Sequence, residues 1–196
     1  MHTRQVKVGN VTIGGGAPIA IQSMSTFSPI DTEAAAAQIN ALAAAGADII
    51  RMAVPDKKAA EALGALRKKV NVPLVADIHF DYRLALTAME QGIDALRINP
   101  GNIGKRENVV KVVDMAKEKH IPIRIGINAG SLPEEILQEY GGHPTAEGMV
   151  EGALTHVRIL EAEGFHDIVI SVKSSDVPMM VKANRLLSEK VDYPLH

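Results

Sequence analysis

Residues 121–128 read IPIRIGIN, a β-rich run that follows a helical pattern and precedes a loop of small residues. Because successive side chains of a strand point to opposite faces, one face of this run is entirely isoleucine, namely Ile123, Ile125 and Ile127. The opposite face carries Arg124, Gly126 and Asn128. We therefore expect the isoleucines to pack against helices and the other three residues to point into an enclosed interior.

The same arrangement of a short apolar run, a polar loop and a helical pattern occurs six times along the 196 residues. The strand candidates are Pro18–Met24, Ala47–Ala53, Pro73–His79, Ala95–Asn99, Pro122–Asn128 and Asp167–Lys173, and a seventh begins at Pro194. The helical patterns are Asp31–Ala45, Asp56–Lys69, Tyr82–Gln91, Arg106–Lys119, Thr145–Ala162 and Asp176–Lys190, and several starts carry capping residues, such as Asp31. Alternating strands and helices predict a parallel sheet with right-handed crossovers. Such a sheet is either an open, doubly wound sheet or a closed barrel.

Two features favour the barrel. An open sheet of the dinucleotide-binding type carries a G-x-G-x-x-G turn after its first strand, where this chain reads Ser23-Met-Ser-Thr26. A barrel places functional groups at the C-terminal ends of most of its strands, as this sequence does. We expect an α/β fold of the TIM-type (β/α)8 class, truncated after about six βα units, because a complete barrel needs ~250 residues.

The N-terminal segment is expected to form a small β-hairpin. Residues 6–16 read VKVGNVTIGGG, with alternating Val and Ile around a Gly-Asn turn. We assign residues 1–16 to this hairpin, which we expect to plug the bottom of the barrel. Residues 17–196 then form the incomplete barrel of the same substrate-binding domain.

Composition excludes several classes of function. A net charge of −2 and a pI near 6.4 argue against binding to nucleic acid or to an anionic membrane. The sequence contains no cysteine, which excludes disulfides and thiolate-held metal within these residues. No leader and no run of ~18 apolar residues occurs, so we expect a soluble, cytoplasmic protein.

The alternation of side chains along each strand, here called strand parity, predicts a ring of cations inside the barrel. Five successive strands each turn one cationic or potentially cationic side chain inward, in the order Arg51, His79, Arg97, Arg124 and Lys173. Burying one unpaired guanidinium costs several kcal/mol, and one inward carboxylate, Asp77, cannot neutralise the set. The missing counter-charge is most simply a ligand with several negative charges, and arginine is suited to bidentate contacts with phosphate.

Other polar residues near the strand ends extend the candidate site. Neutral hydrogen-bonding groups are expected from Asn99, Asn102, Asn128 and Ser171. The alternative for a single inward arginine is a structural salt bridge, such as Asp77 with Arg97 or Arg51. His79 alone is equally compatible with a structural role, and His2, His120, His143 and His156 are assigned structural roles. The same parity turns Phe80 outward, toward the helices.

Several contiguous motifs resemble one bacterial family. They are APIAIQSM (17–24), PLVADIHFDYR (73–83), LRINPGNIG (96–104), IRIGINAGS (123–131) and SVKSSD (171–176). Together they resemble 4-hydroxy-3-methylbut-2-enyl diphosphate synthase, an iron–sulfur oxidoreductase of the methylerythritol phosphate route to isoprenoids. The resemblance implies a barrel that binds 2-C-methyl-D-erythritol 2,4-cyclodiphosphate, which the enzyme converts to 4-hydroxy-3-methylbut-2-enyl diphosphate.

The resemblance also implies residues, cofactor and partners. The substrate-binding residues would be Arg51, His79, Arg97, Asn99, Asn102, Arg124, Asn128, Ser171 and Lys173. A separate C-terminal domain would hold a cluster of the 4Fe-4S type, reduced by flavodoxin or ferredoxin, and would cap the barrel of the other protomer in a homodimer. This chain would bind no metal and contain no catalytic residue, because the family's acid/base glutamate falls beyond residue 196. We therefore expect the chain alone to lack reductase activity.

Two other functions remain open on the sequence. Another phosphate- or pterin-binding barrel, such as a dihydropteroate-synthase-like transferase, would explain the cations but not the motifs. A non-catalytic binding module is the second alternative.

Overall fold

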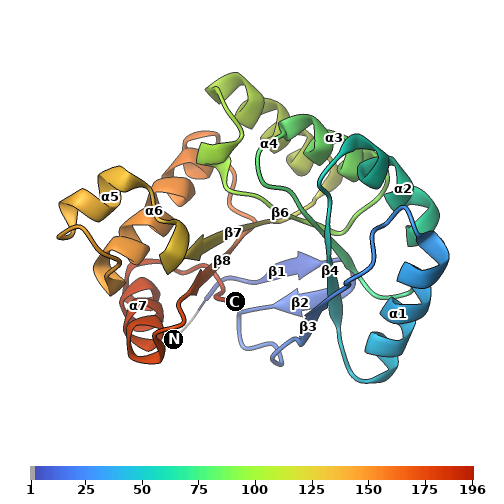
Figure 1. Ribbon diagram of the computed structural model, residues 1–196, viewed down its shortest axis with the longest axis horizontal. Coiled ribbons are helices and arrows are strands. Elements are labelled where there is room, and N and C mark those ends of the chain that lie inside the picture. The colour runs from blue at the N-terminus through green and yellow to red at the C-terminus, as the bar shows by residue number, and fades with distance from the viewer. Residues whose placement is uncertain (1–2) are drawn as a thin grey trace.

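The computed structural model describes residues 3–196, so Met1 and His2, with the role assigned to His2, lie outside the described part. Six parallel strands form one curled sheet (Figure 1). They are β3 (Gln22–Met24), β4 (Ile49–Ala53), β5 (Leu74–Asp77), β6 (Ala95–Arg97), β7 (Ile123–Asn128) and β8 (Ile168–Lys173). Their order in the sheet is the order in the chain, whereas a doubly wound sheet reverses direction at a switch point. The predicted barrel class is confirmed, with a parallel bridge between Ile170 and Leu195 where the seventh strand was expected.

Helices cover the outer face of the sheet (Figure 1). They are α1 (Thr32–Ala44), α2 (Lys57–Arg67), α3 (Tyr82–Glu90), α4 (Arg106–Lys119), α5 (Glu134–Glu139), α6 (Ala146–Ala162) and α7 (Val177–Lys190). The side chains of Asp56, Asp81, Thr145 and Asp176 accept a backbone hydrogen bond at the helix start, whereas Asp31 makes no such bond. The sequence did not predict α5 or the two short 3-10 turns, η1 (Pro100–Asn102) and η2 (Ala129–Ser131).

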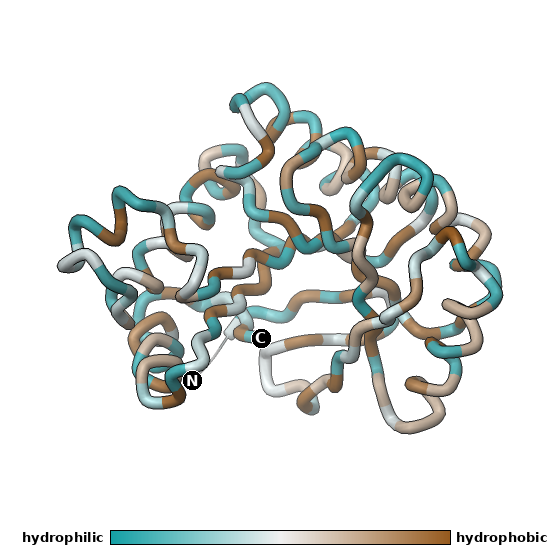
Figure 2. Tube along the Cα trace, in the orientation of Figure 1, coloured by the Kyte–Doolittle hydropathy of each residue, from teal (hydrophilic) through white to brown (hydrophobic). Residues whose placement is uncertain are grey.

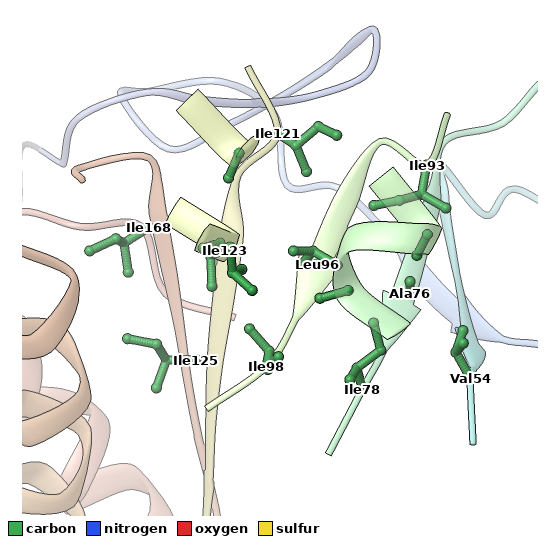
Figure 3. Packing of buried hydrophobic residues seen from close by; sticks show 14 of the residues in the cluster. Val54, Ala76, Ile78, Ile93, Leu96, Ile98, Ile121, Ile123, Ile125 and Ile168 are labelled. Carbon is green, nitrogen blue, oxygen red and sulfur yellow. The ribbon is translucent and has the colours of Figure 1, made fainter. Parts of the chain in front are cut away.

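The main core lies between the sheet and the helices. Ile123, Ile125 and Ile168 are completely buried there, beside Leu96 and Ile98 (Figure 3). Hydrophobic and hydrophilic residues alternate along the elements, as two-faced strands and helices require (Figure 2). Burying each large aliphatic side chain stabilises the fold by about 1.5–3 kcal/mol.

Phe80 does not join this core, and its predicted outward packing is wrong. The side chain is 73% exposed, because β5 ends at Asp77 and strand alternation does not continue into the following loop.

The N-terminal hairpin closes one end of the barrel interior. β1 (Val6–Val8) pairs with β2 (Val11–Ile13) in antiparallel fashion, with Gly9 in the left-handed region at the turn. Val8 packs in a small apolar cluster with Ile49, Val75 and Ala95, which are inward residues at the N-terminal ends of their strands. The hairpin therefore sits at the bottom of the barrel, opposite the strand ends that carry the cations.

A polar cluster ties this bottom edge to the end of the chain. Arg4 forms a salt bridge of 2.9 Å with Asp192, and its guanidinium lies 4.6 Å from the ring centre of Tyr193. The buried Tyr193 hydroxyl donates to Glu161 at 2.8 Å and lies 3.1 Å from Nδ1 of His166. Within residues 3–196, no helix combines the length and the apolar character needed to cross a bilayer.

Candidate anion-binding site

A cavity of about 680 Å³ opens at the C-terminal ends of the strands. Seven of the residues that strand alternation turns inward line it, namely Arg51, Arg97, Arg124, Gly126, Asn128, Ser171 and Lys173. They come from β4, β6, β7 and β8, and sheet register aligns Arg97 with Arg124 and Asn128 with Lys173. Because neighbouring parallel strands bring equivalent inward positions together, residues up to 122 positions apart in sequence share one surface.

Asp77 is the buried carboxylate of this ring, and it pairs with two arginines. Its Oδ1 accepts a hydrogen bond of 3.2 Å from Nη1 of Arg97, and its Oδ2 lies 3.5 Å from Nε of Arg51. The ion pairs that the sequence suggested for Asp77, with Arg97 and with Arg51, are therefore both present. One carboxylate carries a single negative charge, so the pair of guanidinium groups keeps a net positive charge.

Arg124 is the most deeply buried cation of the site, with 7% of the residue exposed. Desolvation, followed by repulsion from Arg51 and Arg97, lowers its pKa to about 10. Its Nη1 lies 3.3 Å from Nδ1 of His196, which points into the same cavity. Desolvation and the charges of Arg124 and Arg51 lower the pKa of His196 to about 4, so this ring is neutral at pH 7 and accepts the hydrogen bond.

Several guanidinium nitrogens of the ring have no hydrogen-bond partner among the described residues. They are Nε of Arg51, Nε of Arg97, and Nε and Nη2 of Arg124. Buried donors are satisfied in most native structures, because each unsatisfied one carries a desolvation penalty of about 1–3 kcal/mol. A ligand with several acceptor oxygens and negative charge would satisfy these donors and neutralise the surplus charge.

Three predicted site residues lie outside the cavity lining. His79 is exposed on the loop after β5, with Nδ1 3.3 Å from Nη1 of Arg97 and Nε2 3.7 Å from Asp77. Asn99 follows the end of β6 and bonds the backbone of Gly126. Asn102 is exposed on η1, where its backbone N–H donates to the carbonyl of Asn99 at 2.9 Å.

The cavity also has lining residues that sequence reasoning missed. Met24 and Gln22 are brought in by the register of β3 with β4, and Nη2 of Arg51 lies 2.9 Å from the Met24 sulfur. Strand parity applied to β3 could have found both. Asn184 comes from α7, where it donates to the carbonyl of Val172 at 3.2 Å, and His196 follows the short bridge to β8. No sequence signal marks Asn184.

The η1 turn beside the site is anchored from the outside. The backbone N–H of Gly101 donates to Nδ1 of His156 on α6 at 3.2 Å. His156 is buried, and desolvation lowers its pKa, which favours the neutral acceptor form. Among residues 3–196, no three His, Asp or Glu side chains gather closely enough to hold a metal ion.

Fold and site together define an α/β-barrel protein with a cationic site at the C-terminal ends of its strands. A family model described as the GcpE TIM-barrel domain matches residues 3–196, and the chain belongs to this family. The resemblance found in the motifs is thereby confirmed.

Curated relatives carry a consistent name, 4-hydroxy-3-methylbut-2-en-1-yl diphosphate synthase (flavodoxin). The Geobacter sulfurreducens protein is 60% identical over 99% of this chain and 55% of its own length. The Symbiobacterium thermophilum protein is 61% identical over 99% of this chain and 52% of its own length. The chain thus spans about half the length of the curated relatives that it matches.

Solved structures of similar fold include dihydropteroate synthases. The Yersinia pestis enzyme has a TM-score of 0.64 at 14% identity, over 100% of this chain and 75% of that one. The Vibrio fischeri enzyme has a TM-score of 0.66 at 12% identity, over 98% of this chain and 76% of that one. At such identities the likeness shows the barrel fold alone.

Proposed function

We propose that this chain is the substrate-binding barrel of a reductase that converts 2-C-methyl-D-erythritol 2,4-cyclodiphosphate to 4-hydroxy-3-methylbut-2-enyl diphosphate in isoprenoid biosynthesis. The names of the curated relatives and the motifs support the reaction. The observation that carries the proposal is the buried Arg124, which has two unpartnered nitrogens and lies beside two further arginines. A diphosphate brings the acceptor oxygens and the negative charge that this cluster lacks.

In this proposal the inward cations hold the diphosphate. Arg51, Arg97, Arg124 and Lys173 contribute charge, and planar guanidinium groups suit two-oxygen contacts with phosphate. Asn128 and Ser171 supply neutral hydrogen bonds to the substrate from β7 and β8. His79 acts at the rim of the cavity, whereas Asn99 and Asn102 act indirectly through the backbone.

Electrons for the reductive ring opening would come from a 4Fe-4S cluster in the whole protein. The residues of this chain do not fit such a cluster, because the sequence contains no cysteine. We therefore assign the cluster and the acid/base glutamate to segments outside these residues, and we expect the chain alone to lack reductase activity. Flavodoxin is the proposed electron donor because the relatives' names include it, with ferredoxin as the alternative.

The proposal extends to the organisation of the protein. Residues 1–16 belong to the same barrel domain as residues 17–196, since Val8 of the hairpin packs against three barrel strands. We further propose that the whole protein is a cytoplasmic homodimer.

Thermal denaturation with the cyclodiphosphate tests the binding function. A ligand at 100 times its Kd stabilises the folded state by about 2.7 kcal/mol, which raises the Tm of a chain this size by roughly 5–10 °C. We expect this rise for the wild-type chain and for the control Arg83→Ala, because Arg83 pairs with Asp81 outside the cavity. Arg124→Ala should abolish it.

Two outcomes would contradict the proposal. One is an unchanged Tm of the wild-type chain at millimolar cyclodiphosphate. The other is a rise that Arg124→Ala retains in full. A rise with a pterin diphosphate alone would instead favour a dihydropteroate-synthase-like transferase.

A further inference from the structure

The side-chain amide of Asn99 forms two hydrogen bonds with the backbone of Gly126 on the neighbouring strand. Its Nδ2 donates to the Gly126 carbonyl at 2.9 Å, and its Oδ1 accepts from the Gly126 N–H at 3.0 Å. The reciprocal pair uses one donor and one acceptor of the amide, which fixes both the backbone on the two sides of Gly126 and the orientation of the Asn99 side chain. Gly126 forms part of the cavity lining.

The guanidinium of Arg97 lies directly against Gly126. A Cβ atom at position 126 would come within 2.9 Å of both Nε and Nη2 of Arg97. Nη1 of the same Arg97 side chain donates to Oδ1 of Asp77 at 3.2 Å and lies 3.3 Å from Nδ1 of His79. The guanidinium is therefore enclosed between a carboxylate and a bare stretch of backbone.

Glycine at this position is not required by the backbone. Gly126 is absent from the residues with positive φ, and it lies inside a regular strand. Alanine could adopt the same backbone conformation, so the requirement for glycine comes from the space that Arg97 occupies.

We propose that Gly126 and Asn99 are positioning residues for Arg97. The glycine leaves the space in which the guanidinium lies, and the Asn99 amide fixes the Gly126 backbone that borders that space. Asn99 thus acts on the ligand through Arg97 instead of contacting it. This inference deepens the proposed function, on which it rests for the identity of the anion.

The chain offers a test that separates positioning from folding. In Gly126→Ala the clashing atoms are the far end of a flexible side chain, so the fold is retained while the guanidinium is displaced. Gly130→Ala is the matched control, because a Cβ there meets nothing within 4 Å and its φ is not positive. The first readout is the Nε–Hε signal of Arg97 in a ¹H–¹⁵N NMR spectrum, assigned by its loss in Arg97→Gln.

We expect this signal to move in Gly126→Ala and in Asn99→Ala, and to stay in place in Gly130→Ala. The second readout is titration with pyrophosphate. Gly126→Ala should weaken binding about tenfold or more in the wild-type background and less than about twofold in the Arg97→Gln background.

An unmoved Arg97 signal in Gly126→Ala would overturn the inference. An equal loss of pyrophosphate affinity in both backgrounds would also overturn it, because Gly126 would then act without Arg97. If the wild-type chain fails to bind pyrophosphate or the cyclodiphosphate, the proposed function fails, and the NMR signal alone decides the positioning role.

Discussion

Replacing Arg124 by methionine is expected to stabilise the free protein. Methionine keeps an unbranched, flexible side chain and removes a buried charge above an apolar floor that includes Val8, Ile49 and Val75. The pKa of Arg124 lies at about 10 instead of 12.5, and each pKa unit corresponds to ~1.36 kcal/mol. The charged form therefore costs up to about 3 kcal/mol at pH 7. We expect a gain of about 1–3 kcal/mol, because the variant also loses the contact with His196.

Urea denaturation at pH 7 in low salt measures this gain, with Arg83→Met as the control. Arg83 is an exposed arginine whose replacement should change stability by less than about 0.5 kcal/mol. The gain should raise the Tm by roughly 2–10 °C. Added pyrophosphate should raise the free energy of unfolding of the wild-type chain and leave that of Arg124→Met unchanged. A variant less stable than the wild type by more than about 1 kcal/mol would refute the reasoning, because the guanidinium would then be well satisfied in the free protein.

Three further predictions concern other contacts. The neutral His196, with a folded pKa of about 4 against 6.5, favours folding above pH 6.5 and loses this contribution as the pH falls toward 4. Urea titrations at pH 7 and 4.5 should therefore show a smaller loss for His196→Gln than for the wild type, and equal losses would contradict the assignment. Gly101→Ala should destabilise the fold by about 1–3 kcal/mol, because its Cβ would lie 2.8 Å from Cε1 of the buried His156. The control Gly130→Ala should leave the free energy of unfolding nearly unchanged in the same urea assay. Tyr193→Phe should lower the free energy of unfolding, measured by urea denaturation, by about 1–2 kcal/mol, because it removes the hydroxyl that contacts both Glu161 and His166. An unchanged urea midpoint would show that the hydrogen bonds of this hydroxyl contribute nothing to stability.

Strand alternation predicted most of the barrel and seven residues that line the cavity. It succeeded for Arg51, Arg124 and Lys173 because these residues lie inside regular strands, where the side-chain period is two. It failed for Phe80, because this residue follows the end of β5 and loop dihedrals do not preserve the alternation.

Other features could not be predicted because they depend on tertiary contacts. The six-residue α5 is too short to show helical periodicity and packs against α6 through residues such as Ile136. Asn184 enters the site because α7 crosses behind β8, which no local pattern encodes. The double pairing of Asp77 was foreseen only as an alternative, since parity places charges on a face without giving their distances.

The arginine cluster lowers the stability of the free protein, and this unfavourable free energy has a physical interpretation. Three guanidinium groups lie in one cavity with a single carboxylate, Asp77, which pairs with only two of them, and selection for stability alone would not favour this arrangement. An arrangement that is unfavourable in the free protein and neutralised by a polyanion is expected at a binding site.

A crystal structure of this chain with 2-C-methyl-D-erythritol 2,4-cyclodiphosphate tests the central claim most directly. We predict phosphate oxygens within hydrogen-bonding distance of Arg97, Arg124 and Lys173, with Nε or Nη2 of Arg124 among the donors. The claim would be contradicted by a ligand bound elsewhere, for example in the groove between α4 and α6, while the strand-end cations keep the contacts described above.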